Sequence, residues 1–144
     1  MRTTIMTLII ASLCCAPAFA DAKKDLAALA GKWQPTSMEL GGHQTPAEQL
    51  KNISLTIEGD KYTVAVDDKI DKGTLKLGKE DKLKTMDIIG TEGPNKGKTY
   101  PAIYELQGDT LRICYNLDGE KRPTEFKATG GKMLLIDYKR VKKS

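Results

Sequence analysis

The fold is decided by residues 53–66, which read ISLTIEGDKYTVAV. Apolar and polar side chains alternate here on both sides of Gly59 and Asp60. Such alternation is typical of half-buried β-strands, and a glycine-aspartate pair between two of them favours a two-residue hairpin turn. This turn predicts the cross-strand pairs Glu58–Lys61, Ile57–Tyr62, Leu55–Val64 and Ile53–Val66. One face of the hairpin is then wholly apolar.

A second hairpin of the same kind is expected at residues 103–115, IYELQGDTLRICY, with Gly108 and Asp109 at its tip. The pairs on its apolar face are predicted to be Leu106–Leu111, Tyr104–Ile113 and Ala102–Tyr115. On the opposite face Glu105 lies across from Arg112, and we expect an ion pair between them. An isolated hairpin is marginal in water, so both apolar faces must meet a common core.

The rest of the chain after residue 30 also reads mainly as sheet. Further strands, each bounded by Gly, Pro, Asp or Asn, are predicted at residues 32–40, 70–77, 84–89, 99–106, 124–127 and 132–141. Pro35 lacks an amide donor, so the first of these strands should lie at an edge or carry a bulge. Helix-forming residues predict a short helix over 21–30, ended by Gly31, and Thr45 is expected to cap another short helix.

About eight short antiparallel strands in sequence, without long crossovers, favour an all-β, up-and-down barrel with a short N-terminal helix. Closure into a barrel removes unpaired strand edges. A β-sandwich is the structural alternative.

The first twenty residues, MRTTIMTLIIASLCCAPAFA, have the features of a signal peptide. A basic residue precedes a short apolar run, and Ala18-Phe19-Ala20 is a small-x-small cleavage site. The run is too short for a transmembrane span. A lipoprotein anchor is not expected because neither Cys14 nor Cys15 follows a small residue. We therefore expect cleavage after Ala20, export to the periplasm or beyond, and a single domain over residues 21–144.

Charge and chemistry exclude several function classes. The 23 basic and 19 acidic residues are mixed along the chain, and the basic tail at 139–143 has no interleaved aromatic residues, so no nucleic-acid binding is expected. His43 is the sole histidine, so a metal site or catalytic pair built on histidine would depend on this one residue. Cys114 opposes an aliphatic residue, and such apolar surroundings raise the pKa of a thiol and make it less nucleophilic. Asp67, Asp68 and Asp71 lack the spacing of a calcium loop. We expect no catalytic residue, metal site or cofactor, and rank an enzyme last.

With the strands placed, Gly31-Lys32-Trp33 resembles the G-x-W start of lipocalins. The chain is also similar, over about residues 27–141, to a lipocalin-like domain family of uncharacterised secreted bacterial proteins that is abundant in planctomycetes. The matching motifs are GDKY at 59–62, GTLKL at 73–77, TEGPNKGKT at 91–99, IYELQGDTLRIC at 103–114 and RPTEF at 122–126. The resemblance implies a barrel closed at one end by Trp33 beside Arg140. It implies no activity.

Two functions follow as hypotheses. In the first, the barrel binds a small apolar or amphipathic ligand, because tyrosines on inward faces need hydrogen-bond partners. The candidate lining residues are Tyr62, Val64, Tyr104, Leu111, Ile113 and Tyr115. In the alternative, side chains fill the barrel, and the protein is a binding or inhibitor-type module for an envelope partner. This module would act through the loop at 90–98, at Gly93, Pro94, Asn95 and Lys96.

Overall fold

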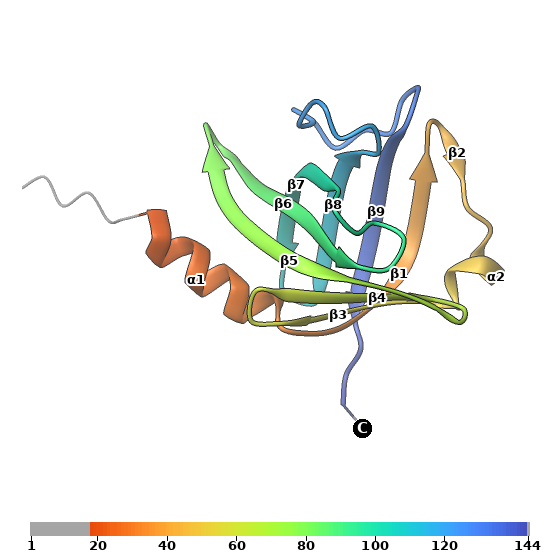
Figure 1. Cartoon of the computed structure of the whole chain (residues 1–144), viewed down its shortest axis with the longest axis horizontal. Helices are drawn as coiled ribbons and strands as arrows, with labels where there is room; N and C mark the ends of the chain where they lie inside the picture. The colour runs from red at the N-terminus through yellow and green to blue at the C-terminus, as the bar shows by residue number, and fades with distance from the viewer. Residues whose placement is uncertain (1–17, 144) are drawn as a thin grey trace, which may run out of the picture.

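The computed structural model describes residues 18–143 (Figure 1). Most of the predicted signal peptide, including Arg2, Cys14 and Cys15, lies outside these residues. Residues 18–20 belong to the first turn of the N-terminal helix α1. Within the described range, neither helix has the length and apolar content needed to cross a bilayer.

The chain forms a closed antiparallel barrel of eight strands with one extra strand and two short helices. The helices are α1 (Ala18–Leu29) and α2 (Ala47–Leu50). The strands are β1 (Gly31–Leu40), β2 (His43–Gln44), β3 (Ile53–Glu58), β4 (Lys61–Val66), β5 (Lys69–Glu80), β6 (Leu83–Glu92), β7 (Thr99–Gln107), β8 (Thr110–Asn116) and β9 (Met133–Arg140). Strands β3 to β9 each pair with the next, and β1 pairs with both β3 and β9 to close the barrel. The up-and-down barrel is therefore confirmed over the sandwich.

Both predicted hairpin registers are confirmed. Ile57 pairs with Tyr62 and Leu55 with Val64 across the β3–β4 turn. Tyr104 pairs with Ile113 across the β7–β8 turn. In each hairpin the alternation of side chains and the two-residue turn agree on one register, because a slip by one residue would move every apolar side chain to the other face.

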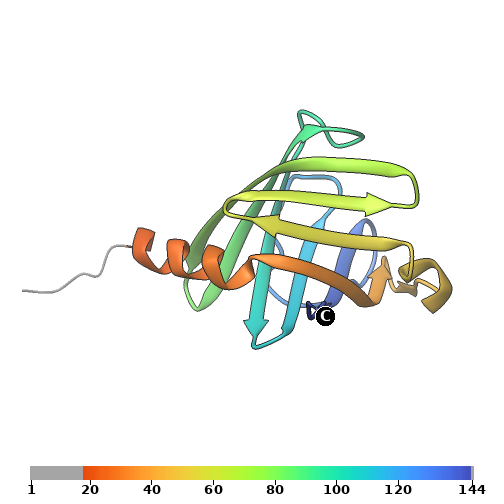
Figure 2. The ribbon, with the colours of Figure 1, turned by 90° about the horizontal axis from the view of Figure 1, so that it is seen from below.

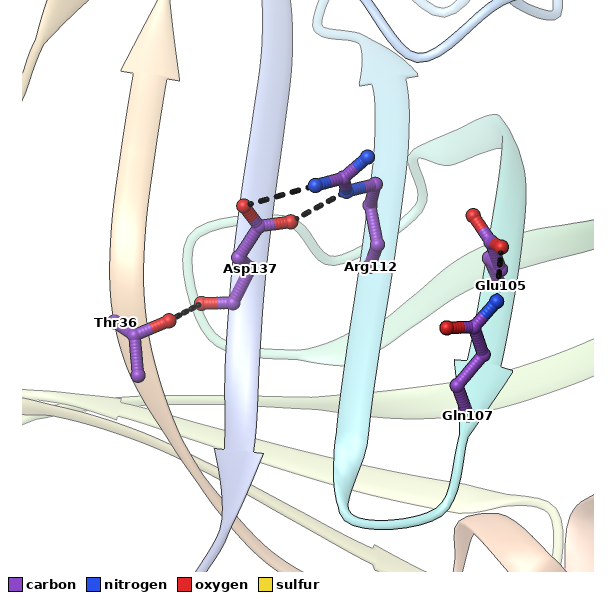
Figure 3. A network of polar contacts seen from close by, with 5 residues as sticks. All are labelled: Thr36, Glu105, Gln107, Arg112 and Asp137. Atoms are coloured by element: carbon purple, nitrogen blue, oxygen red, sulfur yellow. Dashed lines mark hydrogen bonds and ion pairs between the residues drawn. The ribbon is translucent and has the colours of Figure 1, made fainter.

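The ion pair expected between Glu105 and Arg112 is not formed, although the two residues oppose each other. Arg112 Nε instead lies 2.7 Å from Asp137 Oδ1, and Glu105 accepts a hydrogen bond from Gln107 (Figure 3). Strand β9 flanks β8 on its other side and places Asp137 directly across from Arg112. Arg112 therefore lies between two carboxylates, Glu105 on β7 and Asp137 on β9. The sequence of the hairpin contains only the first of them.

Strand β1 carries the bulge that Pro35 predicts. Its pairing with β9 shifts register between Pro35 and Ser37. A proline cannot donate to the ladder, so the irregularity falls where one donor is missing.

Residues 124–127 do not form the predicted strand. They belong to the connection 117–132, which Arg122 attaches to the outer face of the barrel. Arg122 Nη1 donates to the Ala102 carbonyl at 2.9 Å, and Arg122 Nη2 lies 2.7 Å from Asp87 Oδ1. Cys114 alternates with inward-facing residues, yet it is fully buried because this connection covers it. Side-chain contacts, and not a strand ladder, therefore hold this segment to the barrel.

Two smaller expectations also need correction. Helix α2 begins at Ala47, and no side chain caps it, because the N-cap position falls on Pro46, which has no side-chain acceptor, and Thr45 lies one residue too early. The two-residue strand β2, which pairs with the end of β1, was not predicted. It carries His43, which is exposed.

Candidate functional site

One end of the barrel is closed by helix α1 and a stacked pair of side chains. The Trp33 side chain is fully buried, and its Nε1 donates to the Leu29 carbonyl at 2.9 Å. The Arg140 guanidinium lies over the Trp33 ring, 4.3 Å from its centre. This stacked arrangement combines a cation–π contact with exclusion of water from the ring.

Arg140 also ends the helix. Its Nη1 and Nη2 atoms donate to the carbonyls of Ala30 and Ala28 at 2.6 and 2.7 Å. Carbonyls in the last turn of a helix have no partner within the helix, and a cation there also complements the helix dipole. The Arg140 Nε atom lies 3.1 Å from Asp109 Oδ1. Gly31 passes directly beneath, and a Cβ there would lie 3.1 Å from Arg140 Nη1. At the closed end, every nitrogen of the Arg140 guanidinium thus has a hydrogen-bond or ion-pair partner, and the backbone packs tightly against it.

A second contact holds α1 against the barrel. Tyr104 on β7 donates its hydroxyl proton to Asp25 Oδ2 at 2.7 Å, and Lys84 Nζ lies 2.9 Å from the same oxygen. Burial alone would raise the pKa of the Asp25 carboxyl, but the hydrogen bonds from Lys84 and Tyr104 outweigh it and lower that pKa. Figures 1 and 2 place α1 and α2 on opposite sides of the barrel.

Beyond this plug, the barrel interior holds a cavity of about 420 Å³. Most of its lining is aliphatic, from strands all around the barrel. The lining residues are Met38, Ile53, Leu55, Ile57, Tyr62, Val64, Val66, Lys69, Ile70, Asp71, Leu75, Met86, Ile88, Pro94, Asn95, Tyr100, Ile113, Tyr115, Leu117, Leu134, Ile136 and Tyr138. Val66 and Ile70 are 40 and 49 % exposed, so the turn between β4 and β5 forms part of the mouth.

Polar groups gather on one side of this cavity. The Tyr62 hydroxyl lies 3.4 Å from Asp71 Oδ2, and the Tyr100 hydroxyl donates to Asn95 Oδ1 at 3.1 Å. The Tyr100 and Tyr115 rings pack with their centres 5.7 Å apart. Burial, and then the negative charge of Asp71, raise the pKa of both Tyr62 and Tyr100. These phenols remain protonated donors throughout the neutral range.

The hydroxyls of Tyr115 and Tyr138 differ because no group among residues 18–143 hydrogen-bonds them. Every fully buried side-chain nitrogen or oxygen in that range has a partner. These two hydroxyls therefore lie against open space, and both residues line the cavity. Burial raises the pKa of both, with Tyr100 adding to the effect at Tyr115 and Tyr115 adding to it at Tyr138.

The loop between β6 and β7 is built into the mouth of the cavity. The backbone amide of Asn95 donates to Asp71 Oδ1 at 3.1 Å, and its Nδ2 donates to Oδ2 at 2.8 Å. The Gly90 amide bonds to the Lys98 carbonyl, and a Cβ at Gly90 would collide with the Asn95 carbonyl. Pro94 and Asn95 line the cavity, whereas Gly93 and Lys96 are exposed.

The structure brings four of the six predicted ligand-binding residues to the cavity. These are Tyr62, Val64, Ile113 and Tyr115. Tyr104 and Leu111 are also buried inside the barrel, but they are not among the residues that line the cavity, and Tyr104 bonds to Asp25 instead.

Sequence reasoning missed Tyr100, Tyr138 and Asp71. The two tyrosines alternate with Ala102 and Ile136, which are buried in the core, so alternation alone was a sufficient signal for both. Asp71 pairs with Val64 on the inner face. In the sequence, Asp71 stands out only as a candidate calcium ligand, because a lone carboxylate on an inner face carries no sequence pattern.

Other candidate chemistry is sparse. Burial raises the pKa of the Cys114 thiol and outweighs the opposing effect of a backbone hydrogen bond at Lys127. Over residues 18–143, the structure has no group of three or more His, Cys, Asp or Glu side chains placed to hold a metal ion. Comparison with protein-family models, with curated proteins and with solved structures found no match for this chain.

Proposed function

We propose that this protein is an exported, lipocalin-like carrier that binds one small apolar or amphipathic molecule inside its barrel. The observation that carries the proposal is the cavity of about 420 Å³ with its aliphatic wall. Ligand sites in proteins are typically 300–1,000 Å³ in volume and mostly apolar, with a few polar groups that fix orientation. Export rests on the predicted signal peptide, and membership of the lipocalin-like family rests on the quoted motifs.

The size of the cavity limits the ligand. A dry cavity of about 150 Å³ holds one benzene molecule. By that scale, the space here suits a molecule on the order of fifteen to twenty non-hydrogen atoms. An intermediate-length alkyl chain, a small terpenoid or an aromatic metabolite of two to three rings falls in this range.

The alternative, a protein-binding module that acts through the loop at 90–98, has less support. Pro94 and Asn95 line the cavity, and Asn95 is held by Asp71. This loop therefore has a task inside its own fold, which is to shape the mouth. Lys96 alone among the four proposed contact residues carries a charge that a partner protein would recognise.

The test is binding of N-phenylnaphthylamine, an uncharged dye whose fluorescence rises in apolar surroundings. We expect the wild-type chain to bind it with a saturable signal. Val64→Trp fills part of the cavity and should weaken binding at least tenfold, whereas Thr63→Trp, on the outer face of the same strand, should leave it unchanged. Far-UV circular dichroism is the check that both variants are folded. No saturable signal from the wild type, or equal weakening by both variants, would reject the proposal.

A further inference from the structure

We propose that the ligand is electrically neutral and carries a hydrogen-bond acceptor, such as a carbonyl, ether or hydroxyl oxygen, which the hydroxyls of Tyr115 and Tyr138 bind. This inference rests on the proposed function and specifies the ligand class. It predicts discrimination against fatty acids and other anionic lipids of the same length.

The two hydroxyls are the unused donors of the cavity. Tyr138 is only 5 % exposed, lines the cavity, and has no hydrogen-bond partner in the described part of the chain. The hydroxyl is not sealed off, because every fully buried side-chain oxygen among the described residues has a partner, so in the empty cavity only water can bond to it. A ligand acceptor that meets this group takes the place of that water. Tyr115, packed against Tyr100, provides the second donor on the neighbouring strand β8.

The other polar groups of the lining are already engaged. The Tyr62 and Tyr100 protons are donated to Asp71 and Asn95. The side-chain amide of Asn95 donates a hydrogen bond to Asp71. A ligand therefore meets two free O–H donors and an aliphatic wall, which suits an acceptor on an otherwise apolar molecule.

The charges around the cavity disfavour an anion. Of the lining residues, only Lys69 and Asp71 are charged. Lys69 is exposed at the mouth, so no cation lies deep enough to pair with a buried carboxylate. Asp71 adds a negative charge, and that charge contributes to the raised pKa of Tyr62, Tyr100 and Tyr115. An unpaired ion moved from water into such a site pays a large desolvation penalty.

A cationic ligand would gain little from binding near Asp71. The Asp71 carboxylate already accepts from the Asn95 amide, the Asn95 side chain and the Tyr62 hydroxyl. An ammonium group has only donors, so it cannot accept from the Tyr115 and Tyr138 hydroxyls. The neutral acceptor is the one class that uses the free groups without an uncompensated charge.

The experiment compares dodecanol, dodecanoate and dodecylamine as competitors of N-phenylnaphthylamine at pH 7.5, with dodecanol below its solubility limit and the two ions below their micelle concentrations. We expect dodecanol to bind at least tenfold more tightly than either ion. Tyr115→Phe combined with Tyr138→Phe should weaken dodecanol about tenfold, the effect of one lost hydrogen bond, after correction for the dye affinity measured on the same variant. Tyr104→Phe removes the same atom outside the cavity and should change neither affinity.

The outcomes separate the two proposals. Dye binding without any preference among the three competitors would overturn the neutral-ligand inference and keep the carrier. Tighter binding of dodecanoate or dodecylamine than of dodecanol would also overturn it, as would unchanged dodecanol binding by a folded double variant. Failure of the wild type to bind the dye would reject both proposals.

Discussion

The two ends of this barrel are built from the same strands but differ in packing, because one end is plugged and the other opens into a cavity. At the closed end, Trp33 and Arg140 donate short hydrogen bonds to the carbonyls of residues 28–30 and stack on each other, and Asp109 binds Arg140. At the open end, a cavity of about 420 Å³ remains, with Tyr115 and Tyr138 hydroxyls facing it unpaired. The difference indicates that stability is concentrated at one end, and that the other end can keep unfilled space.

This division has an energetic basis. An empty apolar cavity costs free energy because the atoms that line it lose packing contacts. The helix that plugs the closed end buries Leu29 completely and brings Leu26 against the core. Substitutions should therefore cost much stability at the closed end and little at the open end.

The largest effect is expected for Trp33→Ala. It removes a fully buried indole, its bond to the Leu29 carbonyl and the surface under Arg140. We expect a loss of about 3–5 kcal/mol in the free energy of unfolding, measured by urea denaturation with circular dichroism. Val66→Ala, at the mouth, is the matched aliphatic control and should cost less than about 1 kcal/mol. A similar cost for both would contradict the division between the ends.

Arg140→Ala should have the next largest effect, about 2–3 kcal/mol. It leaves the Ala28 and Ala30 carbonyls without their charged donor, and bonds to charged groups contribute roughly 1.5–3 kcal/mol. Arg140→Lys keeps the charge but not the planar fork that reaches both carbonyls and covers the ring. It should recover less than half of the loss in the same denaturation assay. Full recovery by lysine would show that charge alone accounts for the contact.

Asp25→Asn should give a smaller effect that depends on pH. The folded-state pKa of Asp25 is lowered from its usual value of 3.8, so its contribution is present above about pH 4 and is lost as the pH falls through the folded-state pKa. Lys84 is partly exposed, and solvent therefore weakens its ion pair with Asp25. We expect the substitution to lower the free energy of unfolding by about 1 kcal/mol at pH 7. Denaturation at pH 7 and pH 3 should show the difference between variant and wild type shrink. A constant difference would exclude the carboxylate as its source.

The sequence was sufficient to predict the barrel because its strands carry their register locally. Alternation and a glycine-aspartate turn place Leu55 across from Val64 before any tertiary contact is known. The partner of Arg112 could not be predicted in this way, since it depends on which strand flanks β8 on its other side. Likewise, residues 124–127 have strand-like composition, but Arg122 anchors their segment to the outer face.

The candidate site was only half predictable for a geometric reason. A period of two residues tells which face of the sheet a side chain occupies, but not its height along the barrel axis. Tyr104 and Tyr115 both face inward, yet one contacts the plug and the other lines the cavity. The volume of the cavity depends on how all side chains pack around it, which no pairwise pattern contains.

The smallest expected effect is the sharpest test of the comparison between the two ends. Tyr138→Phe removes a hydroxyl that bonds to no group in residues 18–143, so stability without ligand should change by less than about 0.5 kcal/mol, or rise slightly. Tyr104→Phe removes the same atom from a 2.7 Å bond to Asp25 and should cost about 1.5–3 kcal/mol, because the acceptor is charged. Urea denaturation of both variants measures this difference. Equal losses would mean that the Tyr138 hydroxyl bonds within the protein, and the free donor at the open end would then not exist.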